Sequence, residues 1–552
     1  MGSGQVTIPT GVVAGDPEAH ANTDAPGGHE DVLRRVQWWV IVATVAAVPV
    51  AFSTWTLDVF NLTALTVLWV GAIVAVGLEA WTGGLKRLPL PRIWPVVAVY
   101  LGVLALTTFT GRAPVVSLLG NYGRYGGLLT VIPVVTLAWL AARGVGADER
   151  RRYELLGGIA ASGVIGAAYL WAQQLGLDVF SWLEPWQAEP RHPPGVLGNS
   201  NLSGAHLAMA AVPAGFLAAR SRGFSRVVAV ASGVLIISGV AVSQSRGAML
   251  AVAVALALVV SLNTEHRRRL LTIGIALVIA LGIIAVLAND EGLDELSGTT
   301  TWNDRVELWE IALRGAVERP VLGGGPDLYV LTFADHANAS LEGVVADEPH
   351  NVFLDHLDGS GILGAASWLA VVIAVGATAS RSRDPDRVPW MAMGAAYLTQ
   401  AMLSIDVVPL YLWGWVAAAG IVGITDPAFS ERQAPEPSRP RRGSKAVALV
   451  VVPVLVLFAL APFRADMAQR RGIEASNLGD QETAIFQLEQ AADRHGWEAR
   501  HHRRLGIQYV IAGVGADNQT LVSLGVDELE RTLELFPGDA VALEWLEFAT
   551  SR

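Results

Sequence analysis

The sequence predicts an all-α membrane protein: a polytopic helical bundle of about 13 transmembrane helices, with a long helical outer loop and a small C-terminal helical-repeat domain. Hydrophobic residues make up 52% of the 552 residues and charged residues only 16%, whereas an ordinary soluble domain carries roughly 25% charged residues. The mean hydropathy is +0.43. Apolar stretches also recur along the chain between short charged segments. These observations exclude a soluble enzyme and a disordered chain.

Charge and cysteine content exclude further classes. The formal net charge of −11 argues against a nucleic-acid-binding protein, which would need a basic surface. The sequence contains no Cys, so disulfides, zinc ribbons, iron–sulfur clusters and thiol nucleophiles are excluded.

Thirteen stretches are long enough to cross a membrane, which takes about 20 mostly apolar residues. Residues 1–35, which precede them, are polar and predict a disordered cytoplasmic tail rather than a cleaved signal peptide. Nine spans are expected within residues 36–288 and four within residues 351–463. The stretches lie at residues 36–54, 62–81, 93–110, 126–142, 153–175, 200–219, 225–243, 247–262, 270–288, 352–379, 388–405, 409–425 and 446–463.

The charges of the connecting loops predict the orientation. Loops on the same side as the N-terminus hold 23 Lys and Arg residues, and the short loops on the other side hold four. Cytoplasmic loops are enriched in Lys and Arg, so we expect a cytoplasmic N-terminus. An odd number of spans then predicts an extracytoplasmic C-terminus.

Two outer segments stand apart from the spans. Residues 289–350 form a large loop with a helical stretch at Asp304–Val317 and a Gly-rich turn at Gly323–Pro326. Residues 464–552 predict a helical tail in which Gly472 and Gly506 lie 34 residues apart, as in tetratricopeptide repeats. Such repeats bind a protein partner through a concave face. A plain helical hairpin is the alternative.

Three arginines are expected on the outer face, where positive charge is otherwise depleted. Arg191 lies in a Pro-rich loop, Arg246 at the turn between spans seven and eight, and Arg305 near the start of a helix. A guanidinium group suits phosphate oxygens. Snorkelling to lipid headgroups is the other interpretation for any one of them, but three together favour a phosphate-bearing ligand.

His350 stands in Asp347-Glu348-Pro349-His350-Asn351, where the large loop leads into span ten. Pro349 suits the first turn of a helix, which would place His350 at a helix N-terminus. There the helix dipole lowers the pKa of an imidazole, although Asp347 and Glu348 oppose it. A neutral His can accept a proton from a hydroxyl group. A capping or structural His is the alternative.

Other polar residues are weaker candidates. Asp355 could orient His350 or hold its helix, and His206 in span six favours a core position over a site lining. Asn199, Asn201 and Asn351 accompany the Arg and His motifs and could support them. No cluster with metal-ligand spacing is visible, and Gly323-Gly324-Gly325-Pro326 lacks the Lys-Ser/Thr of a phosphate-binding loop. Neither a metal nor another cofactor is expected.

Together these motifs resemble those of the O-antigen ligase and O-antigen polymerase superfamily of membrane glycosyltransferases. The resemblance covers about residues 120–425. The matching motifs, in order, are Gly198-Asn199-x-Asn201, Ser245-Arg246-Gly247-Ala248, Arg305-x-x-x-Trp309, Pro320-x-x-Gly323-x-Gly325, and His350-Asn351-x-x-Leu354 followed by Gly361-x-x-Gly364.

The resemblance implies a reaction at the outer face of the bacterial cytoplasmic membrane. A glycan would pass from undecaprenyl diphosphate to an acceptor hydroxyl group on a glycan, lipid or protein, without a metal ion, and with inversion if the base lies behind the anomeric carbon. Arg246, Arg305 and Arg191 would hold the diphosphate, and His350 would activate the acceptor. The thirteenth span and the outer repeat domain depart from the family, whose bundle commonly has about twelve spans.

Three other functions are alternatives to a glycan ligase. A polymerase, which extends lipid-linked repeat units, shares these motifs. A solute or lipid transporter would place ionisable residues near the bilayer midplane and often shows internal repeats, neither of which is evident here. A scaffold built on the repeat domain would leave the outer Arg and His residues unexplained.

Overall fold

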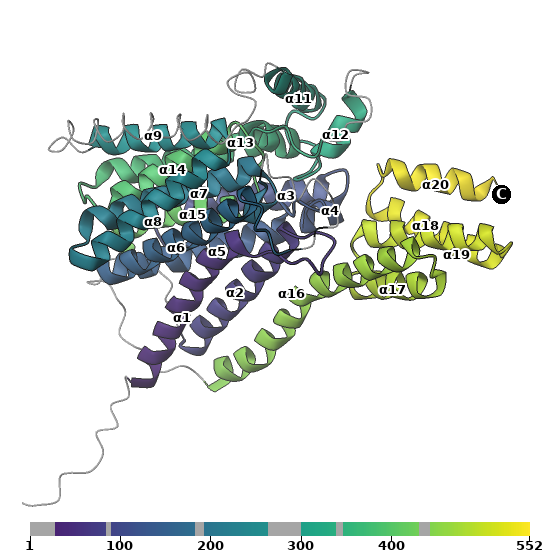
Figure 1. Ribbon diagram of the computed structural model, residues 1–552, viewed down its shortest axis with the longest axis horizontal. Helices are drawn as coiled ribbons and strands as arrows, with labels where there is room; N and C mark the ends of the chain where they lie inside the picture. The colour runs from purple at the N-terminus through teal and green to yellow at the C-terminus, as the bar shows by residue number, and fades with distance from the viewer. Residues whose placement is uncertain are drawn as a thin grey trace, which may run out of the picture.

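The computed structural model describes residues 28–83, 90–180, 182, 193–262, 300–337, 346–429 and 442–551. Within these ranges the secondary structure is helical, without a strand. Nine of the described helices are long and apolar enough to cross a membrane, and α3 (Trp94–Thr110) and α9 (Arg246–Leu262) are shorter apolar helices. The chain is therefore an all-α, polytopic membrane protein (Figure 1).

The helices follow the predicted apolar stretches closely. The stretch at 270–288 lies outside the described residues, and each of the others coincides with a helix. Besides α3 and α9, the bundle comprises α1 (Gly28–Ala47), α2 (Asn61–Trp81), α5 (Leu128–Ala147), α6 (Glu149–Gln174), α7 (Ser200–Arg220), α8 (Gly223–Val242), α13 (Val352–Arg381), α14 (Arg387–Ala401), α15 (Val408–Thr425) and α16 (Arg442–Asn477).

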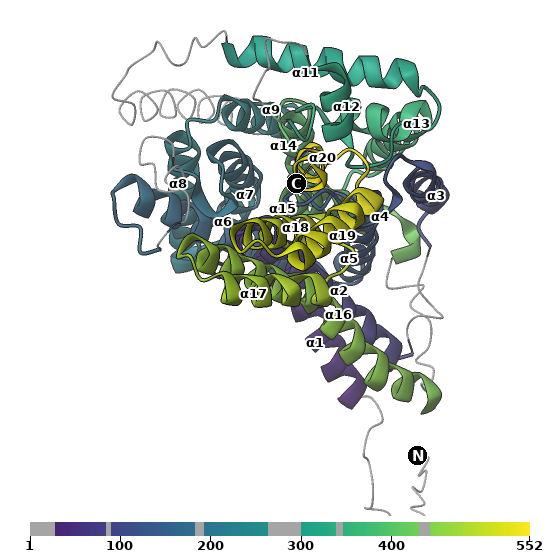
Figure 2. The ribbon, with the colours of Figure 1, turned by 90° about the vertical axis from the view of Figure 1, so that its right-hand side faces the viewer.

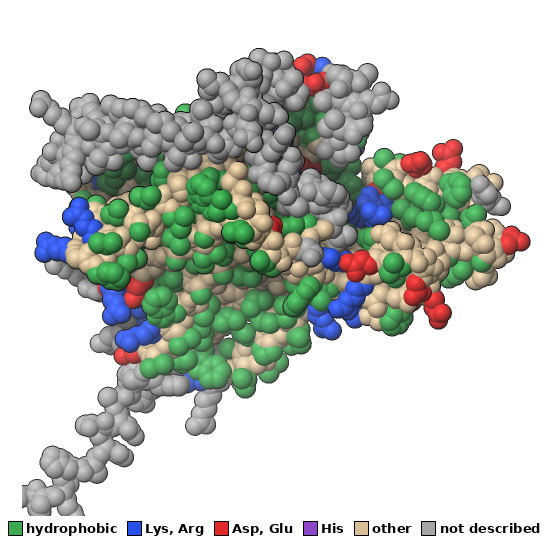
Figure 3. Space-filling model, viewed as in Figure 1, with side chains coloured by type: hydrophobic (Ala, Val, Ile, Leu, Met, Phe, Trp, Pro, Cys, Tyr) green, Lys and Arg blue, Asp and Glu red, His purple; other side chains and the backbone are tan. Residues whose placement is uncertain are grey.

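One apolar core holds these helices together. Trp390 of α14 and Trp413 of α15 are fully buried in it. Gly420 makes room for the first of these rings, because a Cβ atom there would lie 2.0 Å from the Trp390 ring. Apolar side chains also cover the visible outside of the bundle, with charged groups at its margins and on the C-terminal helices (Figure 3). This distribution fits a lipid-facing surface.

The remaining helices gather at the end of the bundle away from the start of α1 (Figures 1 and 2). The short α4 (Pro114–Leu119) follows α3, and α11 (Thr300–Glu318) and α12 (Tyr329–His336) belong to the large loop and pack on α13. The C-terminal helices are α17 (Gln481–Arg494), α18 (Ala499–Gly515), α19 (Gln519–Leu535) and α20 (Ala540–Thr550).

The C-terminal helices form antiparallel pairs, as the glycine spacing indicates. Gly472 of α16 lies against Leu488 of α17, and Gly506 of α18 lies against Leu529 of α19. The small residue in each pair lets the two helices approach closely. Helical hairpins are therefore present, while their assignment to the tetratricopeptide type stays a prediction.

Helix α13 is broken where the predicted span was continuous. Gly361 has φ 62° and ψ −164°, which interrupts the helix. The turn at Gly323–Gly325 lies against this break: the Gly324 N–H donates to the Asp358 carbonyl (2.9 Å) and the Gly325 N–H to the Gly359 carbonyl (2.8 Å). A Cβ atom on Gly323 would lie 2.4 Å from the Asp358 carbonyl oxygen. These glycines therefore permit contact between two main chains rather than the binding of a phosphate.

Three predicted boundaries are wrong. Helix α1 begins at Gly28, so residues 28–35 are helical and not part of the tail. Helix α13 begins at Val352 with Asn351 as its N-cap, so Pro349 is not in its first turn. Helix α16 continues to Asn477 without a break at residue 463, so the last span and the first C-terminal helix are one element. In each case main-chain hydrogen bonds determine where the helix begins or ends, and these bonds cannot be predicted from hydropathy.

Candidate functional site

The candidate residues Arg246, Arg305 and His350 meet at the end of the bundle that carries α11 and α12. Arg246 is the first residue of α9, Arg305 lies on α11, and His350 precedes α13. Arg305 lowers the pKa of His350, and Arg246 lowers the pKa of Arg305. Three sequence motifs separated by up to 104 residues therefore lie in one electrostatic neighbourhood. Arg191 lies outside the described residues.

Small residues place Arg246. Ser245 and Ala248 are buried, and a Cβ atom on Gly204 of α7 would lie 2.9 Å from Cβ of Ser245. On the other side, a Cβ atom on Gly247 would lie 2.6 Å from Oε1 of Gln400 in α14. The Ser-Arg-Gly-Ala motif thus lets α9 approach both α7 and α14, with Arg246 in the first turn.

Arg305 is half-buried on α11. Burial, and then the positive charge of Arg246, lower the pKa of its guanidinium group. Two guanidinium groups that repel each other are stabilised by an anion between them, and phosphate oxygens match their donors well. The pair is therefore suited to bind a diphosphate.

His350 has an unusual main-chain conformation. Its φ angle is 57°, a left-handed conformation that costs a non-glycine residue about 1–3 kcal/mol and persists only where the surroundings enforce it. The next residue, Asn351, caps α13 by accepting hydrogen bonds from the Phe353 and Leu354 N–H groups (3.0 and 3.1 Å).

The surroundings of the imidazole lower its pKa and so favour its neutral form. Burial is the main cause that lowers the pKa of His350, and Arg305 and Arg124 lower it further, while the Glu348 carbonyl and Asp347 oppose them. The pKa of His350 is therefore lowered, as the sequence predicted. Burial and two arginines cause this shift, whereas the sequence pointed to a helix dipole. Nδ1 lies 3.3 Å from the Glu348 carbonyl oxygen. Since a carbonyl only accepts, Nδ1 carries the hydrogen in this contact, and Nε2 is the basic nitrogen.

A cavity of about 80 Å³ adjoins this turn. Arg124, Asp327, Glu348 and Asp406 are among its lining residues. Burial raises the pKa of Glu348 well above its usual value, that of Asp327 to about 6 and that of Asp406 to about 7. The main-chain N–H of Asp406 donates to the Glu348 carboxylate (3.0 Å). The cavity thus joins the His350 turn to the loop between α14 and α15.

Sequence reasoning missed Arg124, which was only one of the counted loop charges. Its Nε and Nη2 atoms donate to the two carboxylate oxygens of Asp347 at 2.6 and 2.7 Å. Burial lowers the pKa of Arg124, but Glu348 and Asp347 outweigh it and raise the pKa above its usual value. The partners are 223 residues apart, so spacing could not reveal them; the Gly-rich context of Arg124 was the available signal.

The supporting candidates have local roles. Asn199 caps α7, accepting from the N–H of Asn201 (2.8 Å) and of Leu202 (3.4 Å). His206 is fully buried, with Nε2 3.1 Å from the Ser162 hydroxyl and its ring 4.9 Å from that of Trp413. The structure thus places His206 in the core, as its position in span six favoured. Asp355 lies in the first turn of α13 and lines the cavity.

Among the residues that the structure describes, no group of three or more His, Asp or Glu side chains is arranged to hold a metal ion.

Residues 202–369 match the model of a protein family described as O-antigen ligase. The matched segment runs from α7 to α13 and includes Arg246, Arg305 and His350. No curated protein sequence matches the chain.

Proposed function

We propose that this chain, whose residues 202–369 match the O-antigen ligase family, is a membrane glycosyltransferase that transfers a glycan from undecaprenyl diphosphate to an acceptor hydroxyl group. The reaction takes place at the outer face of the bacterial cytoplasmic membrane. The acceptor belongs to a glycan, a lipid or a protein.

One observation carries this proposal: Arg305 lies within electrostatic reach of both Arg246 and His350, and it lowers the pKa of His350. The arginines bind the diphosphate of the donor, with Arg191 as a third candidate. Nε2 of His350 takes the proton of the acceptor hydroxyl group. Its oxygen then forms a bond to the anomeric carbon as the bond from that carbon to the phosphate oxygen breaks. The diphosphate leaves with the bonding electrons.

The arginines act on the leaving group. Negative charge builds on the diphosphate as the glycosidic bond breaks, and fixed guanidinium groups stabilise that charge in the transition state. They supply the charge that a divalent metal ion often supplies in phosphate chemistry, so the proposed reaction is independent of added metal. Attack by the acceptor opposite the leaving group inverts the anomeric configuration.

The proposed orientation follows from the loop charges, with the N-terminus in the cytoplasm. Helices α11 and α12 and the C-terminal helices α17–α20 then share the outer side with His350 (Figure 1). The C-terminal helices thus lie where an acceptor or a protein partner of the tetratricopeptide-like domain could meet the site.

Purified protein with lipid-linked donor tests the proposal. Arg246→Ala should weaken donor binding, whereas His350→Ala should stop transfer with donor still bound. An Arg246→Ala variant with unchanged donor affinity and turnover would return Arg246 to a lipid-headgroup role. Formation of a ladder of products from donor alone, without another acceptor, would identify the polymerase branch of the superfamily instead of a ligase.

A further inference from the structure

The turn between α4 and α5, residues 120–127, connects two distant parts of the molecule. On one side, Arg124 forms its two-bonded ion pair with Asp347 at 2.6 and 2.7 Å, three residues before His350. The pair is largely buried, with 15% of the Arg124 side chain and 33% of the Asp347 side chain exposed. A paired guanidinium fixes both the distance and the orientation of a carboxylate. Arg124 therefore holds the main chain that leads into the strained His350.

The turn itself has a fixed shape. Tyr125 has φ 57°, and Gly120 and Gly123 also have positive φ angles. The Asp327 carboxylate accepts hydrogen bonds from the main-chain N–H groups of Asn121 (2.6 Å) and Gly126 (2.8 Å). Both ends of the turn are thus tied to one side chain, and Arg124 lies between them.

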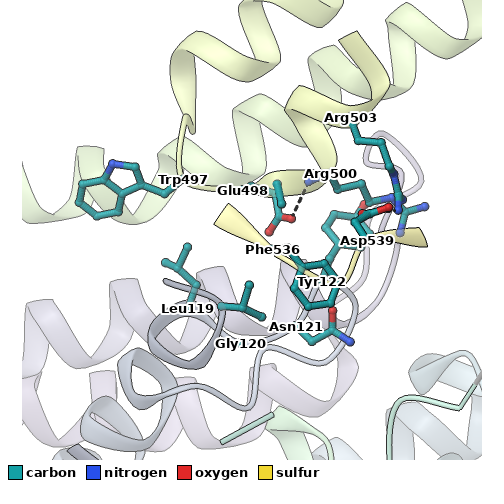
Figure 4. Close-up of a pocket in the computed structure, with 12 residues that line it drawn as sticks. Leu119, Gly120, Asn121, Tyr122, Trp497, Glu498, Arg500, Arg503, Phe536 and Asp539 are labelled. Carbon is teal, nitrogen blue, oxygen red and sulfur yellow. Dashed lines mark hydrogen bonds and ion pairs between the residues drawn. The ribbon is translucent and has the colours of Figure 1, made fainter. Parts of the chain in front are cut away.

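On the other side, Tyr122 joins the turn to the C-terminal helices. Its hydroxyl group donates to Asp466 of α16 (2.6 Å), and the Arg500 guanidinium of α18 lies 4.2 Å from the centre of its ring. Asp466 also accepts from the N–H groups of Leu57 and Asp58, at 2.6 and 3.0 Å. Asn121, Tyr122 and Arg500 line a cavity of about 90 Å³ between the two parts (Figure 4).

We propose that Arg124 is a positioning residue for His350, and that α16, through Asp466, and the C-terminal helix α18, through Arg500, hold Tyr122 and thereby the turn that carries Arg124. This inference rests on the proposed function, because it assigns residues to the geometry of the same base. It gives the C-terminal helices a role at the site without requiring them to bind substrate.

Three charged groups and one main-chain carbonyl act on His350, and their effects on its pKa differ in sign. Arg305 of α11 and Arg124 lower the pKa of His350, whereas Asp347 raises it and the Glu348 main chain accepts a hydrogen bond from it. Removal of Arg124 alone should therefore raise the pKa of His350, and removal of Asp347 alone should lower it. A general loss of structure would not shift the two variants in opposite directions.

The experiment compares Arg124→Gln, Asp347→Asn and their double variant with the matched pair Arg112→Gln and Asp335→Asn. Arg112 and Asp335 also form an outer ion pair, at 2.5 Å between the α3–α4 loop and α12, but it does not involve the His350 segment. Each Arg124 or Asp347 variant should lose about 10- to 100-fold in turnover at saturating donor, a loss typical of a misplaced catalytic group. The double variant should lose no more than the worse single one. The control variants should keep their turnover.

Arg124→Lys separates charge from position, since lysine keeps the charge but loses the two-bonded fork. It should lose turnover while the acid limb of the pH profile stays where it is in the unmodified protein. In Arg124→Gln that limb should move to higher pH, and in Asp347→Asn to lower pH. Multiplicative losses in the double variant, or acid limbs that move together, would overturn the role of Arg124.

Tyr122→Phe tests the brace, with Tyr509→Phe as its control. Tyr509 makes a similar hydrogen bond to Glu489 (2.5 Å), but within the C-terminal helices. Tyr122→Phe should lower turnover several-fold without changing donor affinity, and Tyr509→Phe should not. Equal turnover in both variants would remove the hydrogen bond between Tyr122 and Asp466 of α16 from the proposal.

Histidine titration by NMR keeps this inference separate from the proposed function. The protein has 11 His residues, and the signal that disappears in His350→Ala is that of His350. Opposite shifts of its pKa in Arg124→Gln and Asp347→Asn would support the Arg124 contact even if no glycan transfer were found. Unshifted titration together with normal transfer by the unmodified protein would refute the positioning role alone.

Discussion

A methyl group at Gly323 tests why the large loop packs against the break in α13. In Gly323→Ala the new Cβ would lie 2.4 Å from the Asp358 carbonyl oxygen and 2.5 Å from the main-chain nitrogen of Ser360. These are main-chain atoms, so the two segments must separate. The positive φ of 66° adds about 1–2 kcal/mol for any residue with a side chain.

The cost of separation follows from the contacts that would be lost. Of the main-chain hydrogen bonds that cross this interface, two lie directly beside Gly323, from Gly324 to Asp358 and from Gly325 to Gly359. At about 0.5–1.5 kcal/mol each, they contribute about 1–3 kcal/mol. Gly223→Ala is the matched control, because Gly223 has φ 56° but nothing within 4 Å of its Cβ position. It carries the conformational cost without the clash.

Hydrogen exchange measured by mass spectrometry can compare the two variants peptide by peptide. An interface weakened by about 1–3 kcal/mol opens roughly 5- to 150-fold more often. Peptides that cover residues 320–325 and 358–362 should therefore exchange that much faster in Gly323→Ala than in Gly223→Ala. Equal exchange in the two variants would show that the loop does not depend on this contact.

Three further predictions concern the donor-binding arginine, the catalytic base and the orientation of the C-terminal helices. Arg246→Lys should lose most of its transfer activity in a donor-to-acceptor assay, because lysine keeps the charge but not the paired donors; full activity would argue against diphosphate binding. Turnover should fall as the pH drops through the lowered pKa of His350, which lies below its usual 6.5, because the protonated ring cannot accept a proton; a flat profile from pH 7 to pH 4 would contradict the base. A reporter active only in the cytoplasm should stay silent when fused after Thr550 at the end of α20, and a strong signal would reverse the proposed side of the C-terminal helices.

Hydropathy was sufficient to predict the fold class. Each described apolar stretch is helical because a membrane span must satisfy its main-chain hydrogen bonds internally. The break at Gly361 could not be predicted in this way. It depends on the close approach of Gly323–Gly325, and no local pattern reports contact between segments so far apart.

The site could be predicted in part for the same reason. Arg246, Arg305 and His350 stood out as polar residues in distinctive local contexts, and the structure brings them together. Arg124 escaped notice because its importance lies in its pairing with Asp347, 223 residues away. The φ of 57° at His350 also depends on tertiary contacts, which sequence spacing does not encode.

The most direct measurement of the central claim is donor affinity and turnover on the same purified His350→Ala protein. Loss of a positioned general base typically lowers the rate by about 10²–10⁴-fold. The account predicts a loss of this size with the donor Kd nearly unchanged, since Arg246 and Arg305 remain in place. A parallel loss of affinity and turnover would contradict it, because His350 would then act as a ligand of the diphosphate and not as the base.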